Sequence, residues 1–322
     1  MSFLWISAAA LSAAAMYTNP LPQMGEESYR PYPRHHFRLV AENDSAFGRD
    51  GNYTSGVRLD YARRMADGNA WGVSMTQNIY TPEVHTDGRV PGQQGYAGAF
   101  TLGVGYLMRG EQIGCSTELQ LGAIGNPSIA RETQNGLHRM FDMECWDGWQ
   151  DQVPSEAVVQ LTSRQDMRLG FLEYTTASGW QTDAIAYTCE DVGTLMVSAG
   201  VGLTLRVGRN LPDAMDVVGT QRAAFGLSTI ERAQYKREEL SYFLLASCYV
   251  AYVARDFAID GGLTHHYEQT CSRVPWQVQM RVGVGASYKG IDYFAGALFY
   301  SDRYRTQGWD GRVGTFSITW NW

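Results

Sequence analysis

Long runs of alternating apolar and polar residues constrain this chain more than any other feature of its sequence. The segment WQVQMRVGVGASY, from Trp276 to Tyr288, places its apolar residues on one face and its polar or small residues on the other. The segment LMVSAGVGLTLRVG at 195–208 repeats this pattern, and between 113 and 123 the polar positions are Ser116, Glu118 and Gln120. A period of two indicates a β-strand whose two faces meet different surroundings. These strands are longer than the usual strand of about five or six residues.

Strands of this length suit a bilayer. A tilted strand needs about 9–11 residues to cross, with apolar side chains outward and polar side chains inward. Trp276 and Tyr288 stand at strand ends, where outer-membrane barrels carry aromatic girdles. The chain ends GTFSITWNW, an aromatic-ended strand typical of bacterial outer-membrane proteins. The alternative is a soluble β-sandwich or lipocalin-like barrel, which would have shorter strands and no continuous apolar face.

The pattern predicts an all-β, twelve-stranded antiparallel transmembrane β-barrel with a short helix in an extracellular loop, and an even strand number suits a closed bacterial barrel. The strands are expected at 36–44, 53–64, 70–80, 97–109, 112–124, 157–171, 180–188, 195–208, 239–254, 276–289, 292–302 and 313–322. Short links at 65–69, 110–111, 175–179 and 289–291 are expected to be periplasmic turns. The longer loops then face outside, and 125–156 is the largest of them. The exception is a long insert at 208–238, which falls on the periplasmic side.

The chain begins MSFLWISAAALSAAAMYTNP, an apolar stretch followed by small residues, which predicts a signal peptide at 1–20. A Pro-rich lead at 21–35 follows it, and the barrel occupies 36–322. The net charge of −7 argues against a nucleic-acid partner. The sequence therefore predicts a barrel of the bacterial outer membrane, and we expect it to be a monomer.

The loop at 125–156 is too long for an ordinary β connection, and loops of this length are usually functional. Its centre, Ser128 to Phe141, has helix character with Ser128 as a plausible N-cap. The positions able to form one apolar face are Ile129, Leu137, Met140 and Phe141. Gln134 and His138 lie four residues apart and share another face, and Glu144 follows. The stretch predicts a site with His138 in it, or alternatively a surface helix with one solvated histidine.

Other polar residues are expected at the same extracellular rim. The first strand ends at Asn43 and Asp44, and the second begins with Tyr53 and Thr54. By strand alternation Thr54 is expected on the lumen side. The Asn-Asp pair also fits a simple turn, since both residues favour turns.

Several motifs occur in a fixed order along the chain: ENDSAFGRDGNYTSGVRLDY, NIYTP, QGYAGAF, LGAIGNPSIARETQNGLHRMF, GWQDQ and GRNLPD. As a set they resemble the outer-membrane lipid A 3'-O-deacylase family, and they cover most of the chain that follows the leader. The most specific parts are the Asn-Asp pair, the Tyr-Thr-x-Gly strand start, the Gln-x-x-x-His helix and the Trp-x-Asp-Gln sequence. Each of these motifs would be weak evidence if it stood alone.

The resemblance implies a calcium-dependent ester hydrolase that removes the 3'-linked acyloxyacyl group of lipid A in lipopolysaccharide. The residues that match catalytic positions of the family are Asn43, Asp44, Thr54 and His138. Gln134 and Glu144 match positions beside that site. Calcium prefers hard oxygen ligands, which Asp44, Asn43 and Glu144 offer. We expect His138 to act as a base that activates water, because no GxSxG nucleophile motif is present.

The chain departs from the family pattern in the loop after the third strand. Some members carry a lysine there as an oxyanion partner, whereas this loop has none and offers only His85 and Arg89. Two other functions remain open on the sequence alone. One is an outer-membrane phospholipase with a Ser-His pair, for which Ser128 and Ser155 are the serines near His138. The other is a non-enzymatic, narrow porin-like barrel with a polar lumen.

Overall fold

The computed structural model describes residues 33–212, 220, 227–230, 236, 238–265, 267–268, 270–308 and 311–322. The expected signal peptide at 1–20 and most of the lead at 21–35 lie outside the described residues. The insert at 208–238 is described only in part.

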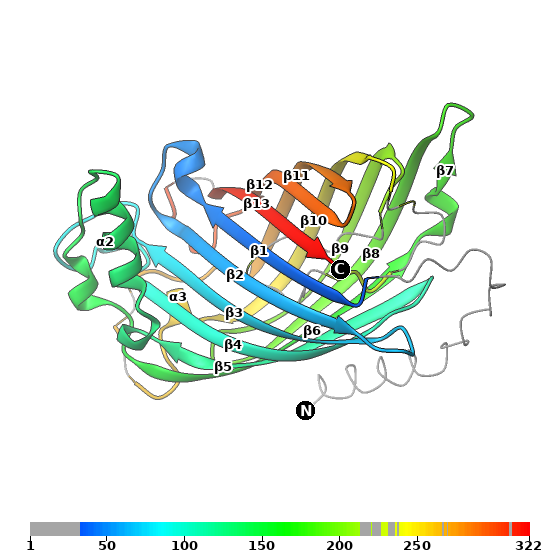
Figure 1. Ribbon diagram of the computed structural model, residues 1–322. Coiled ribbons are helices and arrows are strands. Elements are labelled where there is room, and N and C mark those ends of the chain that lie inside the picture. The colour runs from blue at the N-terminus through cyan, green and yellow to red at the C-terminus, as the bar shows by residue number, and fades with distance from the viewer. Residues whose placement is uncertain are drawn as a thin grey trace.

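The described strands form one antiparallel sheet that closes on itself. They are β1 (His35–Asn43), β2 (Asn52–Arg64), β3 (Ala70–Thr81), β4 (Ala97–Met108), β5 (Ile113–Ile124), β6 (Glu156–Arg168), β7 (Tyr174–Thr175), β8 (Trp180–Gly193), β9 (Met196–Arg209), β10 (Ser241–Asp256), β11 (Trp276–Tyr288), β12 (Ile291–Tyr300) and β13 (Gly311–Asn321). The short β7 pairs with β8 in a hairpin that continues beyond the wall (Figure 1). The other strands make the barrel, and the expected twelve-stranded fold is confirmed.

Two pairings complete the circle. β1 pairs with β13 from His36 opposite Asn321 to Asn43 opposite Gly314. β6 pairs with β8 across the hairpin that contains β7, and every other strand pairs with its neighbour in sequence. The expected strand at 157–171 ends three residues early, because the turn η4 (Gly170–Leu172) begins there.

The short helices lie mainly in the loops at one end of the barrel. They are η1 (Asp44–Phe47), η2 (Asn126–Ser128), α2 (Ala130–Met140), η3 (Gly148–Asp151) and α3 (Phe257–Asp260). Figure 1 shows α2 at the end opposite the C-terminus, which is the end that the loop lengths predict to be extracellular. No helix among the described residues is long and apolar enough to cross a membrane.

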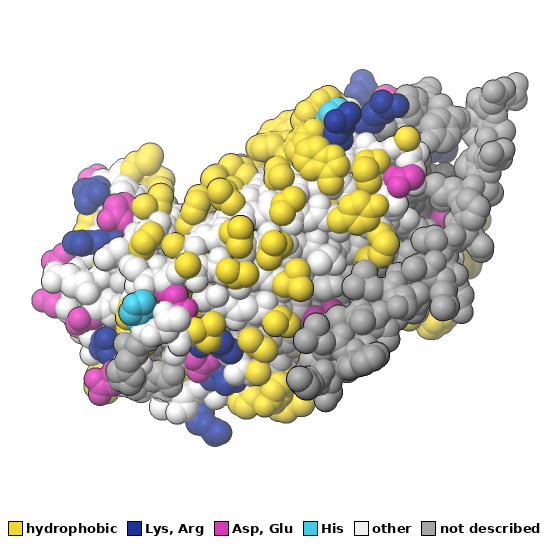
Figure 2. Space-filling model, turned by 90° about the horizontal axis from the view of Figure 1, so that it is seen from below, with side chains coloured by type: hydrophobic (Ala, Val, Ile, Leu, Met, Phe, Trp, Pro, Cys, Tyr) yellow, Lys and Arg dark blue, Asp and Glu magenta, His cyan; other side chains and the backbone are white. Residues whose placement is uncertain are grey.

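The outer face of the wall is apolar, as the alternation predicts. The side chains that are more than half exposed there include Leu102, Val104, Leu121, Val201, Leu244 and Val284. Figure 2 shows apolar side chains over the middle of the outer face and most charged side chains toward its two ends. This is the surface that a bilayer requires of a barrel.

The lumen face is polar and is crossed by buried ion pairs. They are Arg38 with Asp60 at 2.6 Å, Arg58 with Glu118 at 3.0 Å, Arg164 with Asp166 at 2.6 Å, Arg206 with Asp183 at 2.6 Å and Arg281 with Glu42 at 3.0 Å. Charges are retained in such a place only when they are paired. The inward polar residues expected at 113–123 are confirmed, since Ser116 and Glu118 are fully buried.

Described parts of the 208–238 insert contact this lumen network. The Thr220 hydroxyl donates to the Glu42 carboxylate at 2.9 Å, and the Thr229 hydroxyl donates to Asp166 at 2.6 Å. The Arg109 guanidinium donates to the Ser228 carbonyl at 2.6 Å. The insert therefore reaches polar groups of the inner wall at more than one level.

Candidate functional site

Helix α2 lies against the outer face of the wall, over β3 and β4. Gly98 of β4 faces the helix so closely that a Cβ there would be 2.3 Å from the Ala130 Cβ and 2.3 Å from the Ser128 Oγ. Gly98 has the same strand parity as Leu102, which is 57% exposed on the outer face. The side-chain amide of Gln77 on β3 donates to the Ser128 carbonyl at 2.7 Å. The space between α2 and the wall is therefore outside the lumen.

A β-bulge turns Thr54 toward this outer side. Tyr53 pairs with Tyr80 and Ser55 pairs with Ile79, so Thr54 is an extra residue between them. The Thr54 hydroxyl lies 2.6 Å from the hydroxyl of Thr81, which has the strand parity of Ile79. The expectation that Thr54 faces the lumen was wrong, because the bulge breaks the alternation.

His138 is on the buried face of α2, beside Gln134 as the spacing predicted. Its Nδ1 lies 2.5 Å from the backbone carbonyl oxygen of Glu144. A carbonyl only accepts, so Nδ1 carries the proton and Nε2 is left as the basic nitrogen. Nε2 lies 3.4 Å from Oδ2 of Asp50. The Glu144 side chain is exposed, and only its backbone contacts the histidine.

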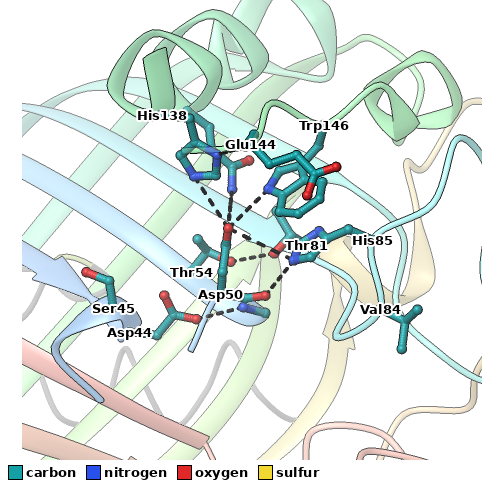
Figure 3. Close-up of polar contacts among 12 residues, drawn as sticks. Asp44, Ser45, Asp50, Thr54, Thr81, Val84, His85, His138, Glu144 and Trp146 are labelled. Atoms are coloured by element: carbon teal, nitrogen blue, oxygen red, sulfur yellow. Dashed lines mark hydrogen bonds and ion pairs between the residues drawn. The ribbon is translucent and has the colours of Figure 1, made fainter. Parts of the chain in front are cut away.

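The Asp50 carboxylate is the centre of the site (Figure 3). The Trp146 indole donates to its Oδ2 at 3.1 Å, and the Gln134 amide donates to its Oδ1 at 3.1 Å. The Trp149 indole donates to the Gln134 carbonyl oxygen at 3.1 Å, which fixes the amide with its N–H groups toward Asp50. Sequence reasoning missed Asp50, although it stands in the motif ENDSAFGRDGNYTSG.

Asp44 is buried on the other side of the same loop. Its Oδ2 accepts the backbone N–H of Gly51 at 2.7 Å, whereas its buried Oδ1 has no hydrogen-bond partner. Burial raises the pKa of Asp44 to about 8, and the negative charge of Asp50 adds to the rise, while the Gly51 N–H opposes it. Asn43 uses its side-chain oxygen to cap η1 through the Ser45 N–H at 2.7 Å.

Of the two oxyanion candidates, His85 belongs to the cluster and Arg89 does not. His85 Nε2 lies 2.7 Å from the Asp50 carbonyl oxygen, and its Nδ1 lies 3.1 Å from the Tyr96 hydroxyl. The His85 ring stacks on Trp146 with centroids 3.9 Å apart. The Arg89 guanidinium instead donates to the Glu268 carbonyl at 3.0 Å, in another loop. Both nitrogens of His85 are thus engaged in holding the Asp50 loop.

The donor set suits a hard cation better than a soft one. Asp44 and Asp50 supply carboxylate oxygens, and the unpartnered Asp44 Oδ1 is the kind of atom that a bound cation would satisfy. Within the part of the chain that the structure describes, no three His, Cys, Asp or Glu side chains gather closely enough to hold a metal by themselves. Backbone oxygens or water would complete the shell.

Chemically, the cluster combines a histidine of fixed tautomer, the Asp50 carboxylate beside its basic nitrogen and the buried carboxyl group of Asp44, whose pKa is raised. A small cavity inside the barrel, lined by Tyr53, Tyr80, Tyr249 and Arg303 among others, includes none of these groups. His138 and the Thr54 hydroxyl lie instead on the outer side of the wall, where α2 packs.

The chain matches the model of the family described as outer membrane protein LpxR over residues 3–322. No curated protein matches it. The solved structure of LpxR from Salmonella typhimurium is similar at 19% identity, with a TM-score of 0.75, over 89% of this chain and all of that one. The β domain of the Bordetella autotransporter BrkA matches at 11% identity, with a TM-score of 0.45, over 91% of this chain and all of that one. The chain therefore belongs to the LpxR family of outer-membrane proteins, the lipid A deacylases that its motifs resemble.

Proposed function

We propose that this protein is a calcium-dependent ester hydrolase that removes the 3'-linked acyloxyacyl group of lipid A in the outer leaflet. The observation that carries the proposal is the tautomer and the orientation of the His138 ring. Its Nδ1 is committed to the Glu144 carbonyl, and its Nε2 faces Asp50 on the outer side of the barrel. This leaves one basic nitrogen beside an anion, on the surface where lipid lies.

Ester hydrolysis needs a base, and His138 suits that role. Nε2 takes a proton from water as the water oxygen attacks the ester carbonyl carbon. The imidazolium that forms is stabilised by the Asp50 carboxylate at 3.4 Å, in a site partly shielded from solvent. The proton then passes to the departing sugar oxygen, which gives a free acyloxyacyl acid and a lipid A hydroxyl.

The proposed calcium would be held by Asp44 and Asp50, and it would polarise the ester carbonyl and stabilise the charge that develops on its oxygen. Asn43 and Glu144 remain candidate ligands from the family pattern. Asn43 would first have to release the Ser45 N–H, and Glu144 would have to turn inward from an exposed position. We therefore rank Asp50 above both of them.

The position of the site supports a lipid substrate. Thr54 and His138 lie on the outer side of the wall, and the lumen is crossed by buried ion pairs. A lipid can reach the outer face from within the leaflet. This arrangement favours lipid A hydrolysis over a porin-like role.

A serine nucleophile finds no support in the geometry. The Ser128 hydroxyl is fully buried and donates to the Gly125 carbonyl at 2.5 Å. It belongs to the turn that precedes α2. The water mechanism with His138 is therefore preferred over a Ser-His phospholipase.

The proposal is tested by mass spectrometry of lipid A after the full chain is incubated with lipopolysaccharide in vesicles. Loss of one acyloxyacyl group is expected with calcium and not with a chelator. The His138→Ala variant should lose activity by a factor on the order of 100 or more while its barrel stays folded on a heat-modifiability gel. Unchanged lipid A from the folded wild-type protein in calcium would overturn the proposal.

A further inference from the structure

Helix α2 is amphipathic in the reverse of the usual sense. Its buried face carries polar residues, namely Gln134, Asn135 and His138, because that face covers the site. The large apolar side chains are exposed instead, with Met140 at 69% and Phe141 at 67%. Water-soluble surface helices place such residues against their core. The exposed apolar side chains of this helix therefore indicate that it contacts an apolar surface.

Most exposed side chains of α2 separate into two flanks. At 3.6 residues per turn, Leu137 and Met140 lie roughly 60° apart around the helix axis, and the exposed Ile129 and Phe141 stand at the two ends of the helix. Glu132 and Arg139 fall together, about 120° away from the middle of the apolar pair. This division resembles a helix that lies at a membrane surface, with one flank in lipid and the other in water.

The turn that leads into α2 packs on the outer surface just beyond the lipid-facing belt of the barrel. Gly98, on which α2 packs, is four residues along β4 from the exposed Leu102, a distance of about 13 Å. On β3, Gln77 bonds the helix turn and is two residues from the exposed Met75. The helix thus stands over the extracellular edge of the same outer surface that faces the bilayer (Figure 1).

We propose that the apolar flank of α2, formed by Ile129, Leu137, Met140 and Phe141, inserts among the acyl chains of outer-leaflet lipids. The insertion would seat His138, on the adjoining face of the helix, at the depth of the ester bonds. This second consequence rests on the proposed function, whereas the insertion itself does not. Lipid acyl chains are the occupant that fits, because the helix stands over the same outer surface as the apolar belt of the barrel.

The insertion is tested with photoreactive p-benzoylphenylalanine, placed at Met140 in one variant and at Glu132 in another. Both side chains are exposed on the same helix, so they form a matched pair. The full-length proteins are folded into vesicles of lipopolysaccharide and phosphatidylethanolamine, irradiated, and analysed by mass spectrometry for lipid adducts. We expect at least fivefold more acyl-chain adducts from position 140 than from position 132.

The measurement is repeated in the His138→Ala background, where the proposed hydrolysis is expected to be lost and the same adduct ratio is expected. It therefore tests insertion even if the proposed hydrolysis fails. Equal lipid adducts at the two positions would overturn the proposal, as would adducts at position 140 to a second copy of the chain. Phe141 serves as a second probe site if the variant at Met140 does not fold.

Discussion

Asp50 organises the site because an ionised carboxylate can only accept hydrogen bonds. The N–H groups of Gln134 and Trp146 point at its two oxygens, and His138 Nε2 lies beside one of them. The loop that carries Asp50 is in turn held through its backbone by His85. A single loop residue thereby fixes the orientation of side chains from helix α2 and from the stretch that follows it.

The indole of Trp149 is expected to act as a positioning group for Gln134. Replacing Trp149 by Phe keeps an aromatic ring in the buried space but removes the N–H that holds the Gln134 carbonyl oxygen. One hydrogen bond contributes about 1 kcal/mol, so we expect kcat to fall about fivefold, with KM much less affected. Steady-state hydrolysis of lipid A in vesicles measures both constants.

Gln150 provides the control for that variant. It is exposed in the same short turn, η3, and Gln150→Ala should leave both constants unchanged. Full kcat in a folded Trp149→Phe protein would mean that the orientation of the Gln134 amide does not matter to the reaction.

At the scale of residues, the sequence predicted the positions of Gln134 and His138 but not the role of Asp50 or the side that Thr54 faces. The spacing of Gln134 and His138 fixed their common helix face, since four residues make about one turn. Asp50 could not be chosen among the charged residues of its loop, because loop geometry has no period to follow. The bulge at Thr54 could not be predicted either, because nothing in the alternating pattern marks the extra residue. One extra residue reverses the side that a strand position faces.

At the scale of elements, the key contact is between α2 and the wall at Gly98. Glycine is required there because any Cβ would overlap the Ala130 methyl and the Ser128 hydroxyl. The close approach lets the polar face of the helix reach the Asp50 loop. The helix begins at Ala130 after Ile129 in a left-handed conformation, so Ser128 precedes the cap position that we expected it to occupy.

Gly98→Ala is expected to lift α2 from the wall. The added methyl would lie 2.3 Å from two atoms of the helix turn, and such overpacking typically costs about 1–3 kcal/mol. We expect hydrolysis to fall at least tenfold while the barrel remains folded. Lipid A hydrolysis and thermal unfolding in detergent together measure the effect.

Gly136→Ala is the matched control, because it adds the same methyl within α2 where no atom of another segment lies within 4 Å. It should stabilise the helix by up to about 1 kcal/mol and leave hydrolysis unchanged. Equal activity in the two variants would show that close packing of α2 on the wall is not needed.

At the scale of the whole molecule, the barrel separates an apolar exterior from a lumen filled with paired charges. Arg58 is fully buried between Asp60 and Glu118, with contacts of 2.6 and 3.0 Å. Strand number and inward polarity were predictable because both follow from the period of two. The partners of each charge were not, since they depend on the register between strands distant in sequence.

Arg58→Met is expected to destabilise the barrel by about 3–5 kcal/mol, because it leaves the buried Glu118 without its cation. Adding Glu118→Gln should recover part of that loss by removing the unpaired charge. Equilibrium unfolding of the refolded proteins in lipid vesicles measures both variants. A single variant as stable as the wild type would argue that water or another group compensates Glu118.

The seam between β1 and β13 has a consequence for the order of assembly. It joins positions near the two ends of the chain, from His36 with Asn321 onward, so it is the pairing with the largest entropy cost of loop closure. It also depends on a strand that is synthesised last. Every other strand can pair with a neighbour in sequence beforehand, but the circle cannot close until β13 is present. Until then the free edges of the sheet remain unpaired, and because an unpaired edge is costly in an apolar environment, we expect closure to be cooperative.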